Sequence, residues 1–257
     1  MAGAVIELAG VSKHYGAVAA LDGAALSVGE GEFVALVGGS GSGKTTLLKT
    51  INRLVNPDAG QVRVGGQDVG ASAPHELRRR IGYVFQEVGL FPHLSVAENI
   101  AVTPKLLGWD KARIAERVEA LLDLVALPRE VGARSPAALS GGQRQRVGVA
   151  RALAAEPKLM LMDEPFGALD PIIRDALGGD YRALHDRLGL TTVMVTHDIA
   201  EAVLLADRIV VLDHGRILAD GAPADLLAEA SDPIVRALLE APKRQAERLR
   251  QRLGASS

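Results

Sequence analysis

The chain has 257 residues, of which 48% are hydrophobic and 23% are charged, as is ordinary for a globular protein. Its net charge of −2 and its 3% of aromatic residues argue against binding nucleic acid by bulk charge or base stacking. The absence of cysteine excludes disulfides, thiolate metal sites and cysteine nucleophiles. Because we find no apolar run of ~20 residues and no signal-peptide pattern, we expect a soluble, cytoplasmic protein.

The first third of the chain predicts short strands around a glycine-rich loop. The predicted strands are 5–8, 24–28, 33–37, 61–64 and 81–86. Residues 13–16 are predicted to form a turn that exposes Tyr15, and residues 77–80 form a basic patch. A helix is predicted to begin at Thr45 and to end before the turn signal at Asn56 and Pro57.

After Gln86 the pattern becomes helical. Ser95 and Glu98 have the spacing of a capping box, which predicts a helix start. Residues 110–126 carry apolar side chains every three or four positions, which predicts a second helix, and Ser140 starts a third. We therefore predict that residues 87–154 are a helical subdomain inserted between strands.

From Lys158 onwards, strands and helices alternate. The predicted strands are 159–162, 191–195, 209–212 and 216–219, and the predicted helices are 171–188 and 199–206. Residues 1–86 and 155–230 are thus predicted to form one α/β core with an antiparallel β subdomain. The Gly178-Gly179 pair within a predicted helix has no explanation at this level. Residues 231–257 are predicted to be a basic helical tail, either solvated or in contact with anionic lipid.

The segment Gly38-Gly39-Ser40-Gly41-Ser42-Gly43-Lys44-Thr45 lies between a predicted strand and a predicted helix, as a phosphate-binding P-loop requires. Glycines allow backbone N–H groups to face phosphate oxygens, and the helix N-terminus adds positive potential. Lys44 would bind the β- and γ-phosphates, and Thr45 would ligate Mg²⁺. The alternative, a flexible Gly/Ser turn, does not explain the Lys-Thr ending. We predict a nucleotide site.

An apolar strand ends in the adjacent carboxylates Asp163 and Glu164. In P-loop proteins the first acid holds Mg²⁺ through water, and the second orients or deprotonates the attacking water. The alternative is a solvated turn at the end of a strand.

The segment Leu139-Ser140-Gly141-Gly142-Gln143 is more diagnostic. Ser140 and Gln143 are explained by a capping box, but two glycines in a first helical turn are not. A phosphate that approaches this backbone closely would explain them.

In this order, residues 38–45, 139–143 and 159–164 followed by His197 resemble the nucleotide-binding subunits of ABC transporters. The resemblance covers about residues 4–230 and implies a RecA-like P-loop NTPase core, ATP and Mg²⁺ as cofactors, and two ATPs sandwiched between two copies of the chain. The implied ATP-binding residues are Tyr15, Gly38, Gly39, Ser40, Gly41, Ser42, Gly43, Lys44, Thr45 and Thr46. The implied contacts to the partner's ATP are Ser140, Gly141, Gly142 and Gln143.

The same resemblance assigns roles in catalysis. Glu164, His197, Gln86 and Lys44 would be catalytic, Tyr15 would stack on adenine, and Asp170 would lie at the subunit contact. The implied metal ligands are Thr45, Gln86 and Asp163. The other histidines show no metal-ligand spacing and are expected to be surface or packing residues: His14, His75, His93, His185 and His214.

The resemblance extends to cargo through residues 86–93, 98–101, 147–153 and 163–171, which are similar to importers of glycine betaine, carnitine, choline and proline. It implies a separate membrane permease, an extracytoplasmic substrate-binding protein, and a location on the cytoplasmic face of the inner membrane. The sequence departs from the pattern of these importers at two points. Arg144 stands where a second glutamine is common, and no paired CBS modules follow residue 230.

Several alternatives stay open. An importer of another solute, such as an amino acid or a polyamine, would have the same motifs. A non-transport ABC ATPase acting on DNA or ribosomes usually carries long coiled-coil insertions or a second cassette, and we find neither in this sequence. A P-loop kinase or GTPase leaves residues 139–143 unexplained, and a pseudo-ATPase is disfavoured because every catalytic position is filled.

Overall fold

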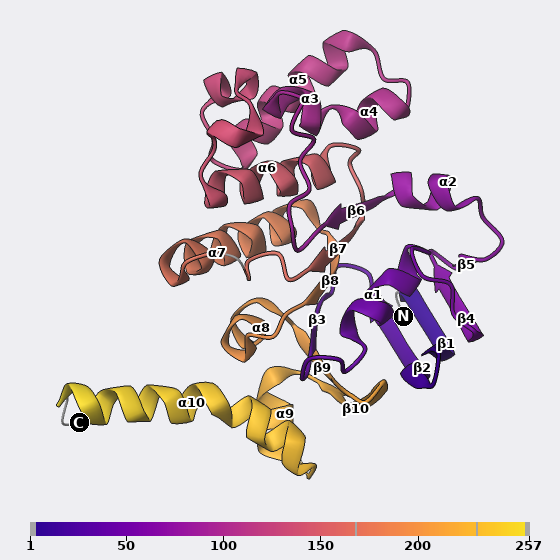
Figure 1. Cartoon of the computed structure of the whole chain (residues 1–257), viewed down its shortest axis with the longest axis vertical. Helices are drawn as coiled ribbons and strands as arrows, with labels where there is room; N and C mark the ends of the chain where they lie inside the picture. Colours follow the sequence, from indigo (N-terminus) through magenta and orange to yellow (C-terminus); the bar gives the residue numbers. More distant parts are fainter. Residues whose placement is uncertain (1–3, 168, 230, 255–257) are drawn as a thin grey trace.

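The structure is a computed structural model that describes residues 4–167, 169–229 and 231–254. Its centre is a six-stranded sheet in the order β10-β9-β3-β8-β7-β6 (Figure 1). Its strands are β3 (Phe33–Val37), β6 (Ile81–Val84), β7 (Leu159–Asp163), β8 (Thr191–Val195), β9 (Arg208–Asp213) and β10 (Arg216–Gly221). All neighbours are parallel except β9 and β10.

This sheet is buried on both faces because β3, β7 and β8 are apolar along almost their whole length. Alternate side chains of β3 enter two separate hydrophobic clusters. Phe33 and Ala35 pack with α7 (Pro171–Leu188) and α8 (Ile199–Leu205), while Val34 and Leu36 pack with α1 (Lys44–Ile51). The predictions for β3, β7, β8 and α7 are confirmed.

A second sheet, antiparallel in the order β2-β1-β4-β5, covers the α1 side of the core. Its strands are β1 (Ala4–Tyr15), β2 (Val18–Gly29), β4 (Ala59–Val64) and β5 (Gln67–Asp68). Two predictions were wrong here. The first two strands are much longer than predicted, and Lys13 and Tyr15 pair with Leu21 and Val18 instead of forming a turn. Register shifts between β1 and β2 allow the two strands to remain paired although their apolar and polar residues do not alternate regularly.

The predicted basic patch at residues 77–80 is largely helical. Helix α2 (Pro74–Arg79) starts with a proline, and the prediction overlooked it. The predicted strand over 81–86 ends earlier, at Val84, so Gln86 lies in the following loop. Helix α1 also stops earlier than predicted, at Ile51.

Between β6 and β7 the chain forms the helical lobe at the top of Figure 1. It contains α3 (Val96–Ile100), α4 (Val102–Leu106), η1 (Arg129–Ala133) and η2 (Pro136–Ala138), with α5 (Lys111–Leu124) and α6 (Gly141–Leu153) as its longest helices. The predicted capping box of Ser95 and Glu98 is present, and Asp110 caps α5. Helix α6 packs against both α3 and β6, which joins the lobe to the core.

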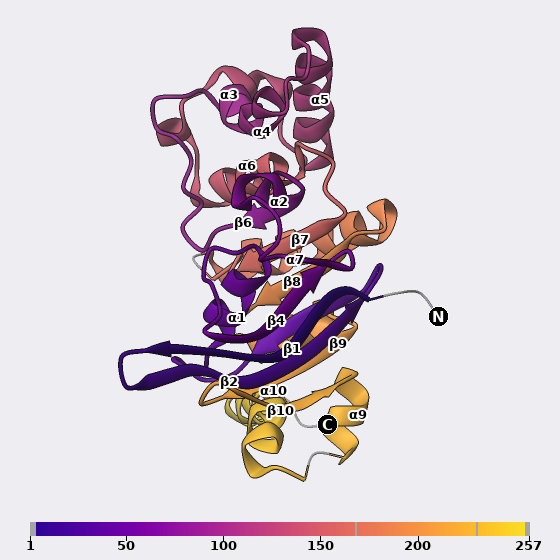
Figure 2. The same cartoon turned by 90° about the vertical axis from the view of Figure 1, so that its right-hand side faces the viewer.

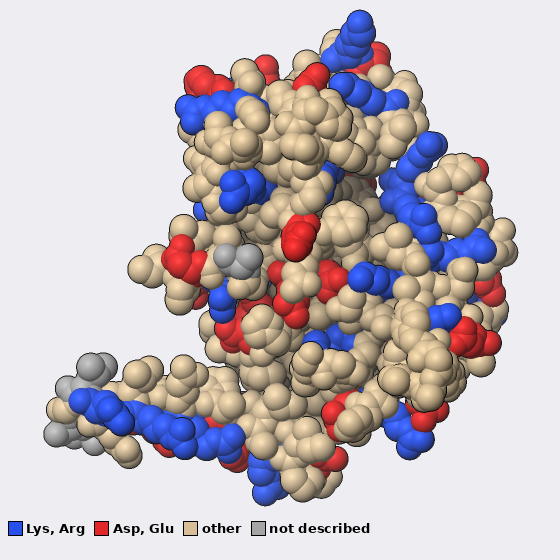
Figure 3. Space-filling model, in the orientation of Figure 1, with Lys and Arg blue, Asp and Glu red and all other residues tan. Residues whose placement is uncertain are grey.

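The chain ends in α9 (Pro223–Glu229) and α10 (Pro233–Leu253). Val235 and Leu239, near the start of α10, are buried in the main cluster. The rest of α10 extends away from the body in Figure 1 and is seen nearly end-on in Figure 2. Basic side chains follow its exposed length (Figure 3). Across the described ranges, we find no helix with the length and hydrophobicity needed to cross a membrane.

Candidate nucleotide-binding site

A cavity of about 500 Å³ lies where β3, β7 and β8 end. The carboxyl ends of parallel strands are where open α/β sheets commonly bind ligands. The cavity is lined by Tyr15, Val18, Ala20, residues 40–46, Glu164 and His197. It therefore gathers side chains that are distant in the sequence but were predicted to share one site.

The glycine-rich loop can adopt its shape only with glycine at two points. Gly43, just before α1, has a φ of +103°, and a Cβ there would lie 2.3 Å from the Ala20 carbonyl oxygen. At Gly38 a Cβ would lie 2.1 Å from the Leu212 carbonyl oxygen. Any side chain at either position would collide with backbone. The loop is thus pressed onto β2 and β9 while residues 40–46 face the cavity.

Lys44 has a buried ammonium group held by its own loop. Its Nζ donates to the carbonyl oxygens of Gly38 at 2.9 Å and Gly39 at 2.7 Å. Burial lowers the pKa of Lys44, and the negative charges of Glu164 and Asp163 act in the opposite direction. Phosphate oxygens entering the cavity would supply this cation with better acceptors than neutral carbonyls.

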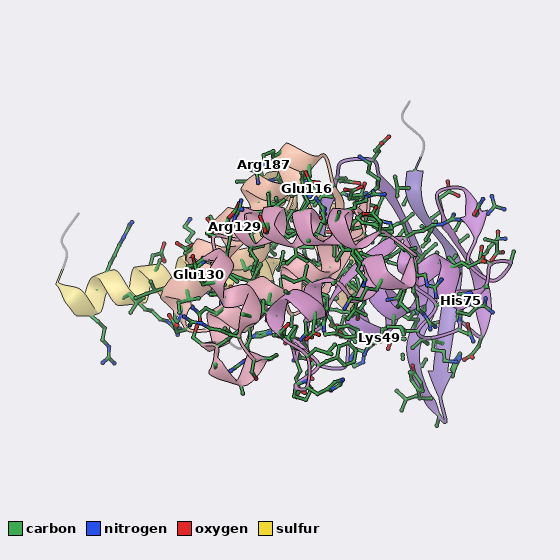
Figure 4. The ribbon with its side chains drawn as sticks, turned by 90° about the horizontal axis from the view of Figure 1, so that it is seen from above. Lys49, His75, Glu116, Arg129, Glu130 and Arg187 are labelled. Atoms are coloured by element: carbon green, nitrogen blue, oxygen red, sulfur yellow. The ribbon has the colours of Figure 1, made fainter. Side chains whose placement is uncertain are left out.

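Thr45 and Asp163 form the polar base of the site. The Thr45 hydroxyl donates to Asp163 Oδ1 at 2.9 Å, and Asp163 is only 5% exposed. No group of three or more His, Asp or Glu side chains among the described residues is placed to hold a metal. A hydroxyl beside one buried carboxylate fits Mg²⁺, because this ion usually takes its remaining ligands from phosphate and water. The histidines outside the site form no such cluster, and His75 lies near the antiparallel sheet (Figure 4).

Glu164 lies at the junction of three loops. Its Oε2 accepts a hydrogen bond of 2.9 Å from Gln86 Nε2 and lies 3.3 Å from His197 Nδ1. Glu164 also has a φ of +45°, a left-handed conformation that is uncommon for a residue with a side chain. Such strain persists only where the surroundings impose it, and it often marks functional sites. Here the Glu164 N–H donates to the Val195 carbonyl at 2.9 Å, which fixes the turn.

Tyr15 is 52% exposed at the rim of the cavity, with Lys13 Nζ 5.6 Å from its ring centroid. A flat, exposed ring beside the phosphate loop is available to stack on a base. Tyr15 comes from the end of β1 and Glu164 follows β7, so two separate sheets supply residues to the cavity.

The residues 140–143 do not line this cavity. Ser140 and Gln143 form the expected capping box at the start of α6, with hydrogen bonds of 3.2 and 3.1 Å. A Cβ on Gly142 would lie 3.0 Å from Ile173 Cγ2, whereas one on Gly141 would meet nothing within 4 Å. Packing against Ile173 therefore explains the glycine at position 142, whereas no contact within the chain explains the glycine at position 141.

Asp170 caps α7 by accepting a hydrogen bond of 3.1 Å from the Ile173 N–H. The predicted role of Asp170 at a subunit contact stays a prediction, and the cap is compatible with it. The neighbouring Ala168, part of the motif that identified Asp170, lies outside the described residues. Arg144, the departure noted above, donates to the Leu139 carbonyl at 2.8 Å and points back along its own loop.

Two residues near Asp163 escaped the sequence analysis. Tyr83 OH lies 3.5 Å and Lys49 Nζ 3.9 Å from Asp163 Oδ2 (Lys49 is labelled in Figure 4). Burial and the nearby Asp163 charge raise the pKa of Tyr83 far above its ordinary value, so the phenol stays a proton donor. Lys49 follows Thr45 by four residues and so shares its helix face, a spacing that the sequence does contain.

Comparisons with known proteins agree with this geometry. The family model for the ABC transporter matches residues 21–167. The glycine betaine uptake system ATP-binding protein YehX of Escherichia coli K12 is 50% identical over 90% of this chain and 75% of its own length. The choline transport ATP-binding protein OpuBA of Bacillus subtilis 168 is also 50% identical over 90% of this chain, which spans only 61% of OpuBA.

The similarity is not confined to one cargo. The sulfate/thiosulfate import ATP-binding protein CysA of Caulobacter vibrioides is 52% identical over 85% of this chain and 65% of its own length. Among solved structures, the dimeric ATP-binding cassette MJ0796 bound to ADP and Pi has a TM-score of 0.77 and 33% identity, covering 84% of this chain and 98% of that one. The family match and these identities show that the chain belongs to the ABC transporter family, as an ATP-binding cassette.

Proposed function

We propose that the chain is the ATP-hydrolysing subunit of an ABC importer for osmoprotectants, namely the quaternary amines glycine betaine, choline and carnitine, or proline. The observation that carries this proposal is the cavity that gathers the P-loop, Glu164 and His197 in a chain 50% identical to a glycine betaine uptake ATPase subunit.

The chemistry follows from the positions of the side chains. Residues 38–46 bind the triphosphate through backbone N–H groups and the Lys44 ammonium. Thr45, Asp163 and Gln86 would hold Mg²⁺, which would neutralise charge that develops on the phosphates. Glu164, held by Gln86 and His197, orients and deprotonates the attacking water. His197 stabilises the γ-phosphate from the loop after β8, which lies between the P-loop and the loop after β7 in the sheet order.

The active unit is a dimer of this chain. Ser140 and Gly141 are exposed at the start of α6 and lie outside the cavity of their own chain. The N-terminus of α6 provides free N–H groups and positive potential, which suit the γ-phosphate of ATP held by a second copy. Asp170 would contact the same partner. The existence of a dimeric relative, MJ0796, supports this arrangement.

The partners proposed are separate permease subunits in the inner membrane and, indirectly, an extracytoplasmic substrate-binding protein. The chain would act at the cytoplasmic face, where ATP is available. These partners are proposed because the relatives with the cited identities are named as parts of uptake and transport systems.

The test is the ATPase activity of the chain reconstituted with its permease and binding protein. We expect glycine betaine, choline, carnitine or proline to stimulate turnover, while sulfate, other amino acids and polyamines leave it unchanged. Stimulation by sulfate would favour the second candidate, a sulfate importer, which the 52% identity to CysA supports. Robust turnover that neither these quaternary amines nor proline change would refute the osmoprotectant assignment and leave the ATPase assignment intact.

A further inference from the structure

Arg174 joins the loop after β7 to the loop after β8, the two loops that carry Glu164 and His197. It lies in the first turn of α7, and its backbone N–H donates to Asp170 O at 2.9 Å. Its Nη2 donates to Leu169 O at 3.1 Å and Gly167 O at 3.4 Å, both in the loop after β7. Its Nη1 lies 3.1 Å from Asp198 Oδ2, in the loop after β8. One guanidinium thus binds both loops.

Asp198 is itself firmly placed. Its Oδ1 accepts hydrogen bonds from the Ala200 and Glu201 N–H groups at 2.9 and 3.2 Å, which caps α8. Its own N–H donates to Thr196 Oγ1 at 3.0 Å. The carboxylate that Arg174 binds is therefore a rigid part of the loop that carries His197.

On their inner side the same two loops meet at the reacting groups. Glu164, at the start of the first loop, lies 3.3 Å from His197 in the second. Gly167 lies against both, because a Cβ there would be 3.5 Å from Glu164 Oε2 and 3.6 Å from His197 Cε1. A shift of one loop relative to the other would therefore change the Glu164–His197 geometry directly.

From these contacts we infer that Arg174 is a positioning residue that makes the loops after β7 and β8 move as one unit. Contact of a second copy with Asp170 would then reach His197 through Arg174 and Asp198. This inference rests on the proposed ATPase function and deepens it, since it says how engagement of the partner sets the catalytic geometry.

An arginine is needed for this task. Its planar fork reaches a carboxylate on one side and two carbonyl oxygens on the other, which the single ammonium of lysine does not reproduce. The group is only a quarter exposed, and its Nε has no hydrogen-bond partner among the described residues. Substitution by lysine should keep the charge and lose the bridge.

Arg182 provides a matched control on the same helix. It donates to Leu205 O at 2.8 Å and pairs with Asp186 and Asp207, so it also ties α7 to the end of α8. Among the described residues, its hydrogen bonds and ion pairs go to Leu205, Asp186 and Asp207, and none goes to Gly167, Leu169 or Asp198. Arg182→Gln should match Arg174→Gln in any loss of stability but not in any loss of turnover.

The experiment measures ATPase kcat and KM, binding of ATP to the isolated chain, and the melting temperature for Arg174→Gln, Arg174→Lys and Arg182→Gln. A misplacement of about 1 Å can cost ~100-fold in rate, so we expect kcat to fall about 10- to 100-fold for both Arg174 variants. ATP binding should stay unchanged. Turnover of Arg182→Gln should equal that of the unmodified chain at temperatures where all variants are folded.

A double-mutant cycle with His197→Ala separates positioning from general stability. If Arg174 acts through the His197 loop, then Arg174→Gln should add no more than about a twofold loss to His197→Ala. Independent, multiplicative losses would overturn the inference, as would unchanged kcat in Arg174→Lys. Absence of turnover in the unmodified chain would instead refute the proposed function, so the two failures are distinguishable.

Discussion

The two segments that we propose to bind phosphate differ in how complete they are. Around the P-loop, Lys44, Thr45 and Asp163 are buried or half-buried and already contact one another or their own backbone. At the start of α6, Ser140 and Gly141 are exposed, and their hydrogen bonds serve only their own helix. One segment is a formed binding site, and the other is a preformed helix end facing outward.

This difference fits the proposed dimer, in which one copy supplies the buried P-loop site and the other supplies the exposed start of α6. A buried site can be assembled within one copy because strands β3, β7 and β8 bring its parts to one sheet edge. Gly141, at the exposed start of α6, makes no contact that requires glycine within its own chain, so we expect it to act when a second copy approaches this helix end. We therefore expect changes at the first segment to affect chemistry or metal binding within one copy, and changes at the second to affect only the dimer.

The largest effect is expected for Glu164→Gln. Loss of a general base typically costs 10²–10⁴-fold in rate, so turnover should fall by about that factor. ATP binding should persist, and the variant should accumulate as an ATP-bound dimer in size-exclusion chromatography. A variant that stays monomeric in ATP, or that hydrolyses at the unmodified rate, would remove Glu164 from this role.

Asp163→Asn should have the next largest effect. The change removes a charge from the base of the site while keeping the shape that Thr45 contacts. Loss of a group that supports a metal commonly costs 10- to 100-fold in affinity or activity. We expect the Mg²⁺ concentration for half-maximal turnover to rise by about this factor. An unchanged Mg²⁺ dependence would exclude Asp163 from metal binding.

Gly141→Ala probes the outward-facing segment. Its new methyl group meets nothing within 4 Å in the chain. Alanine is favoured over glycine by about 0.5–1 kcal/mol in the middle of a helix, and the gain should be smaller at Gly141, the first residue of α6. The melting temperature should rise slightly and ATP binding should be unchanged, yet turnover should fall about 10- to 100-fold because the methyl blocks a partner's phosphate.

Gly179→Ala is the matched control, because this glycine also lies in a helix with open space at its Cβ. It should raise the melting temperature at least as much as Gly141→Ala does, because Gly179 lies in the interior of α7, and it should cause no loss of turnover. Equal turnover in both variants would mean that nothing approaches Gly141, and the comparison between the two segments would fail.

The smallest effect concerns the stability of the nucleotide-binding core. His185 is buried with its ring against Phe33, and it contacts Thr192 Oγ1 at 3.0 Å. Burial lowers the pKa of His185 from its ordinary 6.5. Below pH 6.5 the unfolded chain binds this proton and the folded chain does not, so the stability present above pH 6.5 falls as the pH decreases.

We therefore expect His185→Gln to flatten the dependence of the melting temperature on pH between about 5 and 7. Hydrogen exchange should place the pH-dependent loss in β3 and β8, next to His185, and not in α6. The same slope in both proteins would show that groups other than His185 set the response.

The sequence alone determined much of this protein. Strong local signals specified β3, β7, β8 and α7 to the residue or nearly so, because continuous apolar runs, proline and capping residues act over a few positions. The P-loop, the Asp163-Glu164 pair and the start of α6 were found for the same reason, since each is a short motif with its own local chemistry.

Only the tertiary structure decided how these motifs meet. The long pairing of β1 with β2 depends on register shifts that no alternation signals, and Gly178 is explained by Leu205, whose Cδ1 would lie 3.2 Å from an added Cβ. The contacts of Arg174 with Gly167, Leu169 and Asp198 join residues on two loops. Such contacts depend on sheet order and on distances between separate segments, and no local pattern in one sequence encodes them.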